Sequence, residues 1–265
     1  MINVPRLDKR RVLFPTFVAR CPRIHETGET AFYMKKNDYQ MKSFDQNYVA
    51  KDSTFRFRCT QCGECCRNVK REDKVILSTV DIYRAAKFLD IEVQEVLGKY
   101  CDMLPGGESM LPLIILKERL DGSCSFLKKG KCVIHEAKPI ACALQPLGRL
   151  FMLDDVTGEQ EFRYYLKEFS CGAERDEAVK VQEWLDRFHI EEYDECIKLY
   201  KRLGSVCSRL MHEAKTMEDK QEMFQTAFFL MYAKYDKNEP LQPQIAQNLA
   251  FIQSLHPKSS FKNLN

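Results

Sequence analysis

The chain has 265 residues, of which 45% are apolar, and a formal net charge of +3. This length provides a real core for one large domain or two smaller ones, and the apolar content excludes general disorder. The small net charge argues against a dedicated nucleic-acid surface. The longest apolar stretch, residues 110–116, is interrupted by Pro112 and is far too short to cross a bilayer, so we expect no membrane insertion.

The N-terminal segment, residues 1–50, is expected to be a solvated basic extension. Its first 23 residues carry six basic side chains and one acidic side chain. A transit peptide and a basic binding arm are the alternatives for such a composition. We find no apolar core of a secretory signal after the N-terminus, and we therefore expect a cytoplasmic protein.

Short strands and helices are predicted for the middle of the chain. Residues 55–57 alternate like a strand. Residues 78–89 have the apolar spacing of a helix, and Ser78 stands three residues before Asp81, as in a helix cap. A second helix is predicted for residues 92–100.

The next segment reads as a series of strands. A buried strand is predicted for residues 113–118, followed by a turn. Residues 124–134 have the pattern of a hairpin that turns at Gly130, which would bring Cys124 and Cys132 together across the strands.

Pro139 then suits the first turn of a short helix that carries Cys142. Another hairpin is predicted from residue 149 to residue 169. From about residue 174 the pattern becomes helical, with Trp184 as the anchor between this helical part and the preceding residues.

Three helices are predicted for the C-terminal part. The first has an apolar stripe at helical spacing. The stripe consists of Tyr193, Cys196, Ile197, Tyr200, Leu203, Cys207 and Leu210. The second and third cover residues 217–235 and 243–255 and are separated by a loop.

Twelve cysteines are the most informative part of the composition. In a reducing compartment, dense thiol clusters bind metal or perform redox chemistry more often than they form disulfides. Eight of them lie in one part of the chain, and these are the candidate metal ligands: Cys59, Cys62, Cys65, Cys66, Cys124, Cys132, Cys142 and Cys171.

Four of these cysteines lie in the stretch RCTQCGECCR, residues 58–67. A metal ion or an iron–sulfur cluster removes the repulsion between neighbouring thiolates by making them ligands. The C-x-x-C spacing lets two sulfurs reach one centre, and Gly63 permits the tight turn between them. Adjacent side chains diverge on a helix or strand, so Cys65 and Cys66 are expected to serve different centres unless one is a supporting or reactive thiol.

The residues alone leave the nature of the centre open. Eight cysteines permit two zinc sites with four thiolates each, or one four-cysteine cluster with four further thiols. C-x-x-C-x-x-C also opens a bacterial ferredoxin run, but the next cysteine here follows at once rather than after three residues. The predicted cofactor is therefore zinc or iron, with an iron–sulfur cluster as one form of the latter.

Other residues near the motifs have simpler explanations. Cys196 and Cys207 are expected to pack in the core as small apolar groups, and Cys21 and Cys101 to be structural or exposed. His135 is a further donor, but the cysteines already suffice as ligands. A group of cations near the first cysteines could offset thiolate charge or form a solvated surface. These cations are Arg56, Arg58, Arg67, Lys70 and Arg71.

The ordered motifs CTQCGECC, GSCSFL, GKCVIHEAKPIAC and ALQP resemble the CxxCxxCC cysteine-cluster family, the YkgJ-like zinc- or iron-chelating proteins. The resemblance spans roughly residues 55–195 and matches the eight candidate cysteines to those of the family. It implies metal binding without a settled reaction. The chain departs from the family pattern at His135, where Tyr is typical, and at Lys138, where Arg is typical. A related branch, the flagellin lysine-N-methylases, has a similar cysteine cluster, which keeps an enzymatic function open.

Two functional hypotheses follow. The first is a metal-binding protein with a structural or metal-carrying centre, and the second is an iron–sulfur-dependent enzyme of lysine-N-methylase-like or redox type. The absence of G-x-G-x-x-G, phosphate-loop and H-E-x-x-H motifs leaves other cofactor chemistry without support. A protein partner bound by the C-terminal helices is a third hypothesis.

The expected fold class is α+β, mainly helical, with short β-hairpins around a cysteine-ligated metal centre. The expected domains are a basic extension at 1–50, a metal-binding domain at 51–175 and a helical region packed on it at 176–265.

Overall fold

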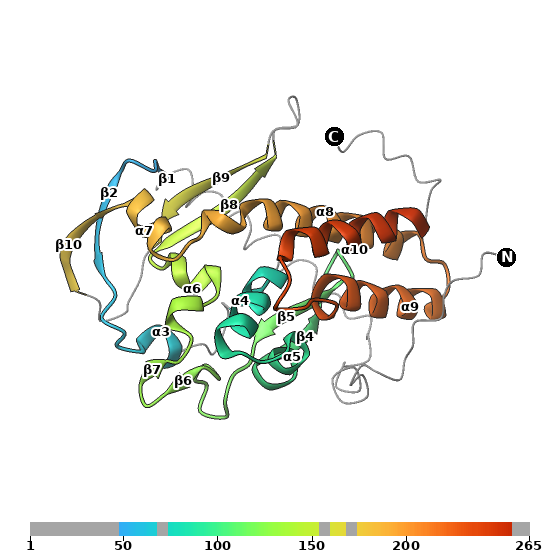
Figure 1. Cartoon of the computed structure of the whole chain (residues 1–265), viewed down its shortest axis with the longest axis horizontal. Helices are drawn as coiled ribbons and strands as arrows, with labels where there is room; N and C mark the ends of the chain where they lie inside the picture. Colours follow the sequence, from blue (N-terminus) through green and yellow to red (C-terminus); the bar gives the residue numbers. More distant parts are fainter. Residues whose placement is uncertain (1–47, 68–73, 154–159, 168–173, 256–265) are drawn as a thin grey trace.

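A computed structural model describes residues 48–67, 74–153, 160–167 and 174–255. The fold is mixed α+β, as predicted, with most of the small antiparallel sheets and the shortest helices toward one end and the longest helices toward the other (Figure 1). No helix within these ranges is both long enough and apolar enough to cross a membrane.

The described strands form four small antiparallel sheets. They are β1 (Tyr48–Val49), β9 (Gln160–Leu166) and β8 (Leu147–Leu153); β10 (Glu174–Lys180) and β2 (Thr54–Arg58); β3 (Ile76–Leu77), β5 (Pro112–Leu116) and β4 (Cys101–Pro105); and β6 (Leu127–Lys128) and β7 (Lys131–Cys132). The strand predicted at residues 55–57 is part of β2, whose Phe55 and Phe57 are buried while their neighbours on the strand are exposed. The buried strand predicted at residues 113–118 is β5.

The predicted helices occur in the expected order, the short helix at Glu64–Arg67 was not predicted, and the helix predicted over 217–235 becomes π-helical after residue 228. The helices are α3 (Glu64–Arg67), α4 (Thr79–Leu89), α5 (Val93–Tyr100), α6 (Ile140–Leu144), α7 (Val181–Arg187), α8 (Asp194–Glu213), α9 (Met217–Phe228) and α10 (Leu241–Leu255), with single turns η1 (His135–Ala137), η2 (Glu191–Tyr193) and the π-helical η3 (Phe229–Ala233). The cap predicted for α4 is confirmed. The Ser78 hydroxyl accepts a hydrogen bond from the backbone N–H of Asp81, and the Asp81 carboxylate accepts one from the backbone N–H of Ser78 at 2.7 Å.

Two segments after residue 173 differ from the prediction. Residues 174–180 form strand β10 rather than helix, because they pair antiparallel with β2. The helical part therefore begins only at Val181. Helix α10 begins at Leu241 instead of residue 243. Pro243 lies inside its first turn, where proline is tolerated because the backbone N–H would have no helical partner.

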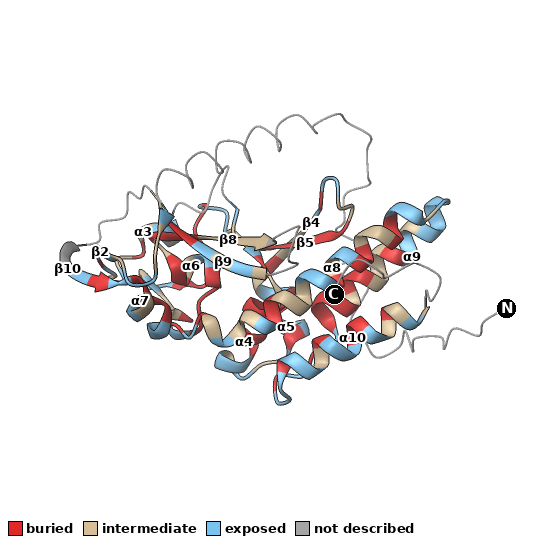
Figure 2. Cartoon of the chain, turned by 90° about the horizontal axis from the view of Figure 1, so that it is seen from above, coloured by how far each residue is buried: buried red, intermediate tan, exposed pale blue. Residues whose placement is uncertain are grey.

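One continuous core joins the two ends of the molecule, and buried side chains recur in elements of both (Figure 2). Trp184 on α7 is fully buried in it. The indole N–H donates to the carbonyl of Ala143 on α6 at 3.1 Å, and the ring makes edge contacts with Phe55 and Phe57 on β2. The predicted anchoring role of Trp184 is confirmed.

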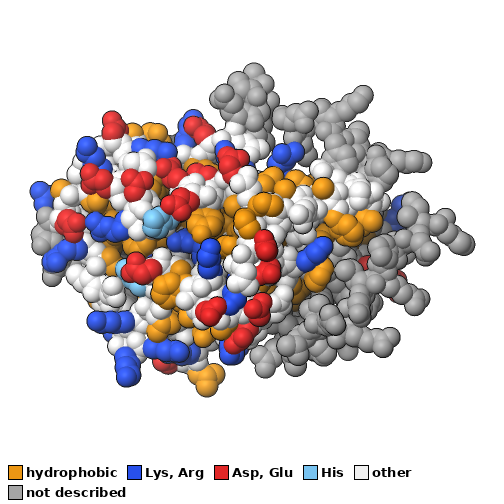
Figure 3. Space-filling model, viewed as in Figure 1, with side chains coloured by type: hydrophobic (Ala, Val, Ile, Leu, Met, Phe, Trp, Pro, Cys, Tyr) orange, Lys and Arg blue, Asp and Glu red, His pale blue; other side chains and the backbone are white. Residues whose placement is uncertain are grey.

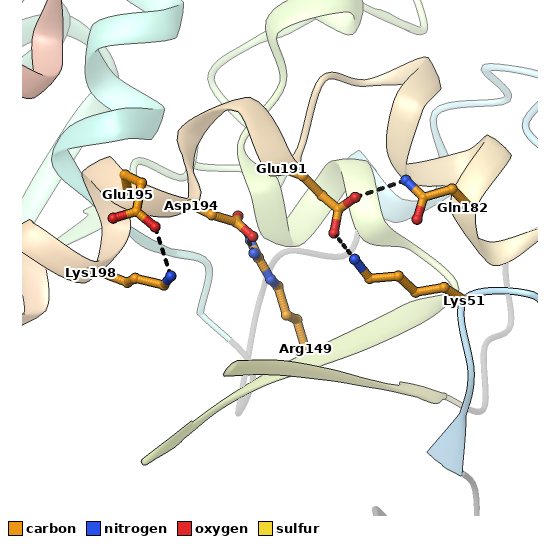
Figure 4. A network of polar contacts seen from close by, with 7 residues as sticks. All are labelled: Lys51, Arg149, Gln182, Glu191, Asp194, Glu195 and Lys198. Carbon is orange, nitrogen blue, oxygen red and sulfur yellow. Dashed lines mark hydrogen bonds and ion pairs between the residues drawn. The ribbon is translucent and has the colours of Figure 1, made fainter. Parts of the chain in front are cut away.

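A polar network fixes the start of α8 against the small sheets (Figure 4). Arg149 on β8 forms an ion pair with Asp194, the first residue of α8. Glu191 on η2 pairs with Lys51 and accepts a hydrogen bond from the Gln182 side chain at 2.7 Å. These contacts and Trp184 connect the helical end to the sheets next to the cysteines.

Acidic and basic side chains are interspersed over the described part of the face in Figure 3. This mixture agrees with the small net charge of +3. It gives that face no extended field of one sign to attract a polyanion such as nucleic acid.

Candidate metal centre

Seven of the eight candidate cysteines lie within the described residues, and Cys171 lies outside them. None of the seven is in a disulfide. They come from three separate parts of the chain: the loop after β2 together with α3, the segment around β6 and β7, and α6. Figure 1 places α3, β6, β7 and α6 at the same end of the molecule. The fold therefore gathers the motif cysteines at one end.

Gly63 lets the first cysteine segment approach the β6–β7 hairpin. Its φ of +75° favours glycine, and a Cβ atom at this position would lie 2.5 Å from the backbone oxygen of Gly130. At the hairpin, Lys129 and Gly130 both have positive φ, as a type I′ two-residue turn requires. Gly63 therefore has the turn conformation that the sequence predicts. It also permits a close approach to the backbone of Gly130, which the sequence pattern does not reveal.

The hairpin turns at Gly130 as predicted, but its register differs. Leu127 pairs with Cys132, whereas Cys124 lies before the hairpin and pairs with Glu118. The backbone N–H of Cys124 donates to the carbonyl of Cys66 at 2.7 Å. This bond holds Cys124 beside α3 and not opposite Cys132.

The Cys66 thiol has one direct thiol contact and two further thiols nearby. Its sulfur lies 3.9 Å from that of Cys65, and the thiols of Cys124 and Cys132 are near enough to shift its pKa. The adjacent sulfurs therefore do not diverge as the sequence predicts. Two thiolates on one tetrahedral zinc ion, with bonds of about 2.3 Å, lie about 3.8 Å apart. The separation between Cys65 and Cys66 is close to this value.

The protons of this group are divided unequally. Interaction with the Cys66 thiol lowers the pKa of Cys65 to about 6 and that of Cys132 to about 7, against the opposing effect of burial. It also lowers the pKa of Cys124, whereas the neighbouring thiols raise the pKa of Cys66. Burial raises the pKa of Cys142. Two of these thiols are therefore available as thiolates near neutral pH, the form in which cysteine binds metal.

Lys138 is the buried cation next to these thiols. Its ammonium lies 4.1 Å from the ring centroid of Phe188, and its charge lowers the pKa of Cys65 and of Cys132. Of the cations that the sequence suggested for this role, Arg67 pairs at the surface with Glu64. Arg56 and Arg58 are exposed on β2, and Lys70 and Arg71 lie outside the described residues. The position of Lys138 between two motif cysteines, within CVIHEAKPIAC, is the sequence signal that could have identified it.

A second contact between donors involves Cys59 and His135. The Cys59 sulfur lies 3.7 Å from Nε2 of His135, and Nδ1 of the same ring lies 3.3 Å from a carboxylate oxygen of Glu136. Partial burial, and then the charge of Lys138, lower the pKa of His135, which favours the neutral imidazole. The sequence singled out His135 without including it among the ligands, and the structure brings it to a motif cysteine.

The donors fit zinc or iron by type, because thiolates and imidazole are preferred ligands of both metals. Within the described ranges, however, no group of three or more His, Cys, Asp or Glu side chains is placed so that it could hold a metal ion. The close contacts are pairwise, between Cys65 and Cys66 and between Cys59 and His135. Metal binding would therefore require further cysteine sulfurs to move towards one of these pairs.

These features define a cysteine-cluster protein with an α+β fold. Residues 58–172 match the model of the CxxCxxCC family, described as "Putative zinc- or iron-chelating domain". The resemblance seen in the motifs is therefore confirmed for this segment of the chain. The family description supports a role in metal binding.

One curated relative is the uncharacterized protein MJ0661 of Methanocaldococcus jannaschii, which is 34% identical over 94 residues. The alignment covers 34% of this chain and 44% of the relative, so the chain matches less than half of the relative's length. No solved structure matches the chain.

Metal-free protein should react with iodoacetamide first at Cys65. This thiol is exposed, and with a pKa of about 6 it is mostly ionised at pH 7. Cys207 is buried and has a pKa of about 12, so it should remain unmodified until the protein unfolds. Peptide mass spectrometry after timed labelling measures both rates. Equal labelling of Cys65 and Cys207 would contradict the arrangement described above, and bound metal should slow the labelling of Cys65.

Proposed function

We propose that this chain is a metal-binding protein that chelates zinc or iron through its cysteine cluster. The observation that supports this most strongly is the placement of motif cysteines from distant parts of the chain. The backbone N–H of Cys124 donates to the carbonyl of Cys66 at 2.7 Å, and the Cys66 sulfur lies 3.9 Å from that of Cys65. The proposed ligands are drawn from the eight motif cysteines, namely Cys59, Cys62, Cys65, Cys66, Cys124, Cys132, Cys142 and Cys171.

The contrast with the other cysteines supports a role as ligands. Cys101, Cys196 and Cys207 are buried in the core, and burial raises the pKa of each. The pKa of Cys65 and of Cys132 moves in the opposite direction, because hydrogen bonds and a buried ammonium favour the thiolate. A thiol that only fills space has no need of such partners, whereas a metal ligand does.

The form of the metal is a separate part of the proposal. An all-thiolate set suits zinc and also suits an iron–sulfur cluster, and the second would favour the enzymatic alternative. Purification without oxygen followed by an absorption spectrum distinguishes them. Broad visible absorption with bound iron indicates an iron–sulfur cluster, whereas a colourless protein with stoichiometric zinc indicates a zinc centre.

The decisive variant replaces both Cys62 and Cys65 with Ser. Serine is a poor ligand for soft-favouring centres, so the double variant should lose the stoichiometric zinc or iron found in the parent protein. Cys196→Ser and Cys207→Ser, on the buried face of α8, should retain it. Elemental analysis of freshly purified proteins gives the metal content, and circular dichroism verifies that each variant is folded. Full metal content in the double variant would overturn the assignment.

The proposal also includes a cellular compartment and a functional division of the chain. Free thiolates require a reducing compartment such as the cytoplasm. We assign metal binding to residues 51–175, and we assign to residues 176–265 a supporting helical region that could also bind a protein partner. Strand β10 spans this boundary and pairs with β2, so the two parts share a sheet.

A further inference from the structure

We propose that His135 is a ligand of the metal centre through Nε2, together with Cys59. This inference rests on the proposed metal binding and specifies its donor set as imidazole plus thiolates rather than thiolates alone. Cys59 follows β2 and His135 begins η1, so tertiary packing, not local sequence, brings the two side chains together.

The separation of the two donor atoms suits a shared ion. A tetrahedral zinc ion with a bond of about 2.3 Å to sulfur and about 2.0–2.1 Å to nitrogen holds these atoms about 3.6 Å apart. The Cys59 sulfur and Nε2 of His135 are 3.7 Å apart. An ion could therefore bridge them with little movement of either side chain.

The ring of His135 is also oriented as a metal ligand would be. A histidine that binds metal through one nitrogen usually donates the other ring N–H to a carboxylate or carbonyl oxygen, which fixes the tautomer. Here Nδ1 lies 3.3 Å from Oε1 of Glu136, and Phe188 contacts the ring edge at a centroid distance of 5.8 Å. The lone pair of Nε2 is then left facing Cys59.

His189 provides a matched comparison. It too has a carboxylate partner at Nδ1, with Glu192 at 2.6 Å, but its side chain is 64% exposed whereas that of His135 is 19% exposed. The same substitution at the two positions therefore separates loss of a ligand from loss of a surface His–Glu pair.

The test uses cobalt(II), whose spectrum reports the number of sulfur and nitrogen ligands. The full chain, His135→Gln and His189→Gln are titrated with cobalt and then with zinc in competition. His135→Gln should shift the ligand-field bands and weaken zinc binding by at least about tenfold, since even the loss of a group that only supports a ligand typically costs 10–100-fold. His189→Gln should match the parent protein. His135→Cys should bind metal with stronger sulfur-to-cobalt charge transfer.

The outcomes distinguish this inference from the function on which it rests. A parent-like spectrum and affinity in His135→Gln would show that His135 is not a ligand while leaving metal binding intact. If His135→Gln does not fold, His135→Cys decides, and unchanged charge-transfer intensity in that variant overturns the inference. A parent protein that binds neither cobalt nor zinc would overturn the inference and the zinc form of the proposed function together.

Discussion

Removal of metal with a strong chelator is expected to raise hydrogen–deuterium exchange throughout residues 55–172, most strongly at residues 59–67 and 124–144. Residues 190–235 should remain comparatively protected. The reason is the size of the elements around the cysteines. Helix α3 has 4 residues, strands β6 and β7 have 2 each, and α6 has 5. Elements this short have no stability of their own and depend on what crosslinks them.

The size of the effect follows from the energies involved. Thiolate-bound zinc contributes roughly 10–16 kcal/mol in small zinc-finger peptides. A whole domain is stable by only about 5–15 kcal/mol, so loss of a metal crosslink can unfold the region that depends on it. Helix α8, by contrast, has 20 residues and a continuous buried face from Cys196 to Met211, which needs no metal.

Mass spectrometry of peptic peptides, with and without chelator, measures this difference. Zinc added back after chelation serves as the control, because it should restore protection at residues 59–67 and 124–144. Uniform exchange along the chain, whether or not metal is present, would argue against a structural metal. The cysteines would then form an accessible carrying or catalytic site on a scaffold that folds without it.

Local signals account for the parts of the fold that the sequence predicts well. The Ser78–Asp81 pair marks the start of α4, because a capping box involves residues only three positions apart. The apolar stripe of α8 likewise identifies the face that carries Cys196 and Cys207 in the core. The motif cysteines are identifiable for the same reason, since C-x-x-C is a local spacing.

The misassigned features depend on contacts between distant residues. Strand β10 has the sequence ERDEAVK, which does not alternate, and only its pairing with β2 makes it a strand. The position of Cys124 is set by its hydrogen bond to the carbonyl of Cys66. Lys138 and His135 lie between two motif cysteines in the sequence, but their contacts with Phe188 and Cys59 arise from tertiary packing, so spacing alone marks them as candidates without assigning a role.

The second large effect is expected from Gly63→Ala. Alanine at a φ of +75° is strained. Its Cβ would also lie 2.5 Å from the backbone oxygen of Gly130, and this clash can be relieved only by a movement of the backbone. The shift would move the segment that carries Cys65 and Cys66 away from the hairpin that carries Cys132. If the metal-free protein can relieve this strain and the metal-bound protein cannot, a strain of about 1–3 kcal/mol alone lowers zinc affinity roughly 5- to 150-fold.

Two further glycine variants separate the causes of this effect, with zinc affinity measured by competition against a chromophoric chelator and stability by urea denaturation. Gly130→Ala has a similar φ of +77°, but its Cβ would meet only the Arg67 side chain at 3.5 Å, so it carries the strain without the backbone clash. Gly98→Ala, in the interior of α5 with nothing within 4 Å, should stabilise the protein by about 0.5–1 kcal/mol and leave zinc affinity unchanged. We expect Gly63→Ala to lose more affinity than Gly130→Ala. If the two variants lose the same amount of zinc affinity, backbone strain controls the site and the approach of α3 to the hairpin does not. Parent-like zinc affinity in Gly63→Ala would mean that this approach is not required for binding.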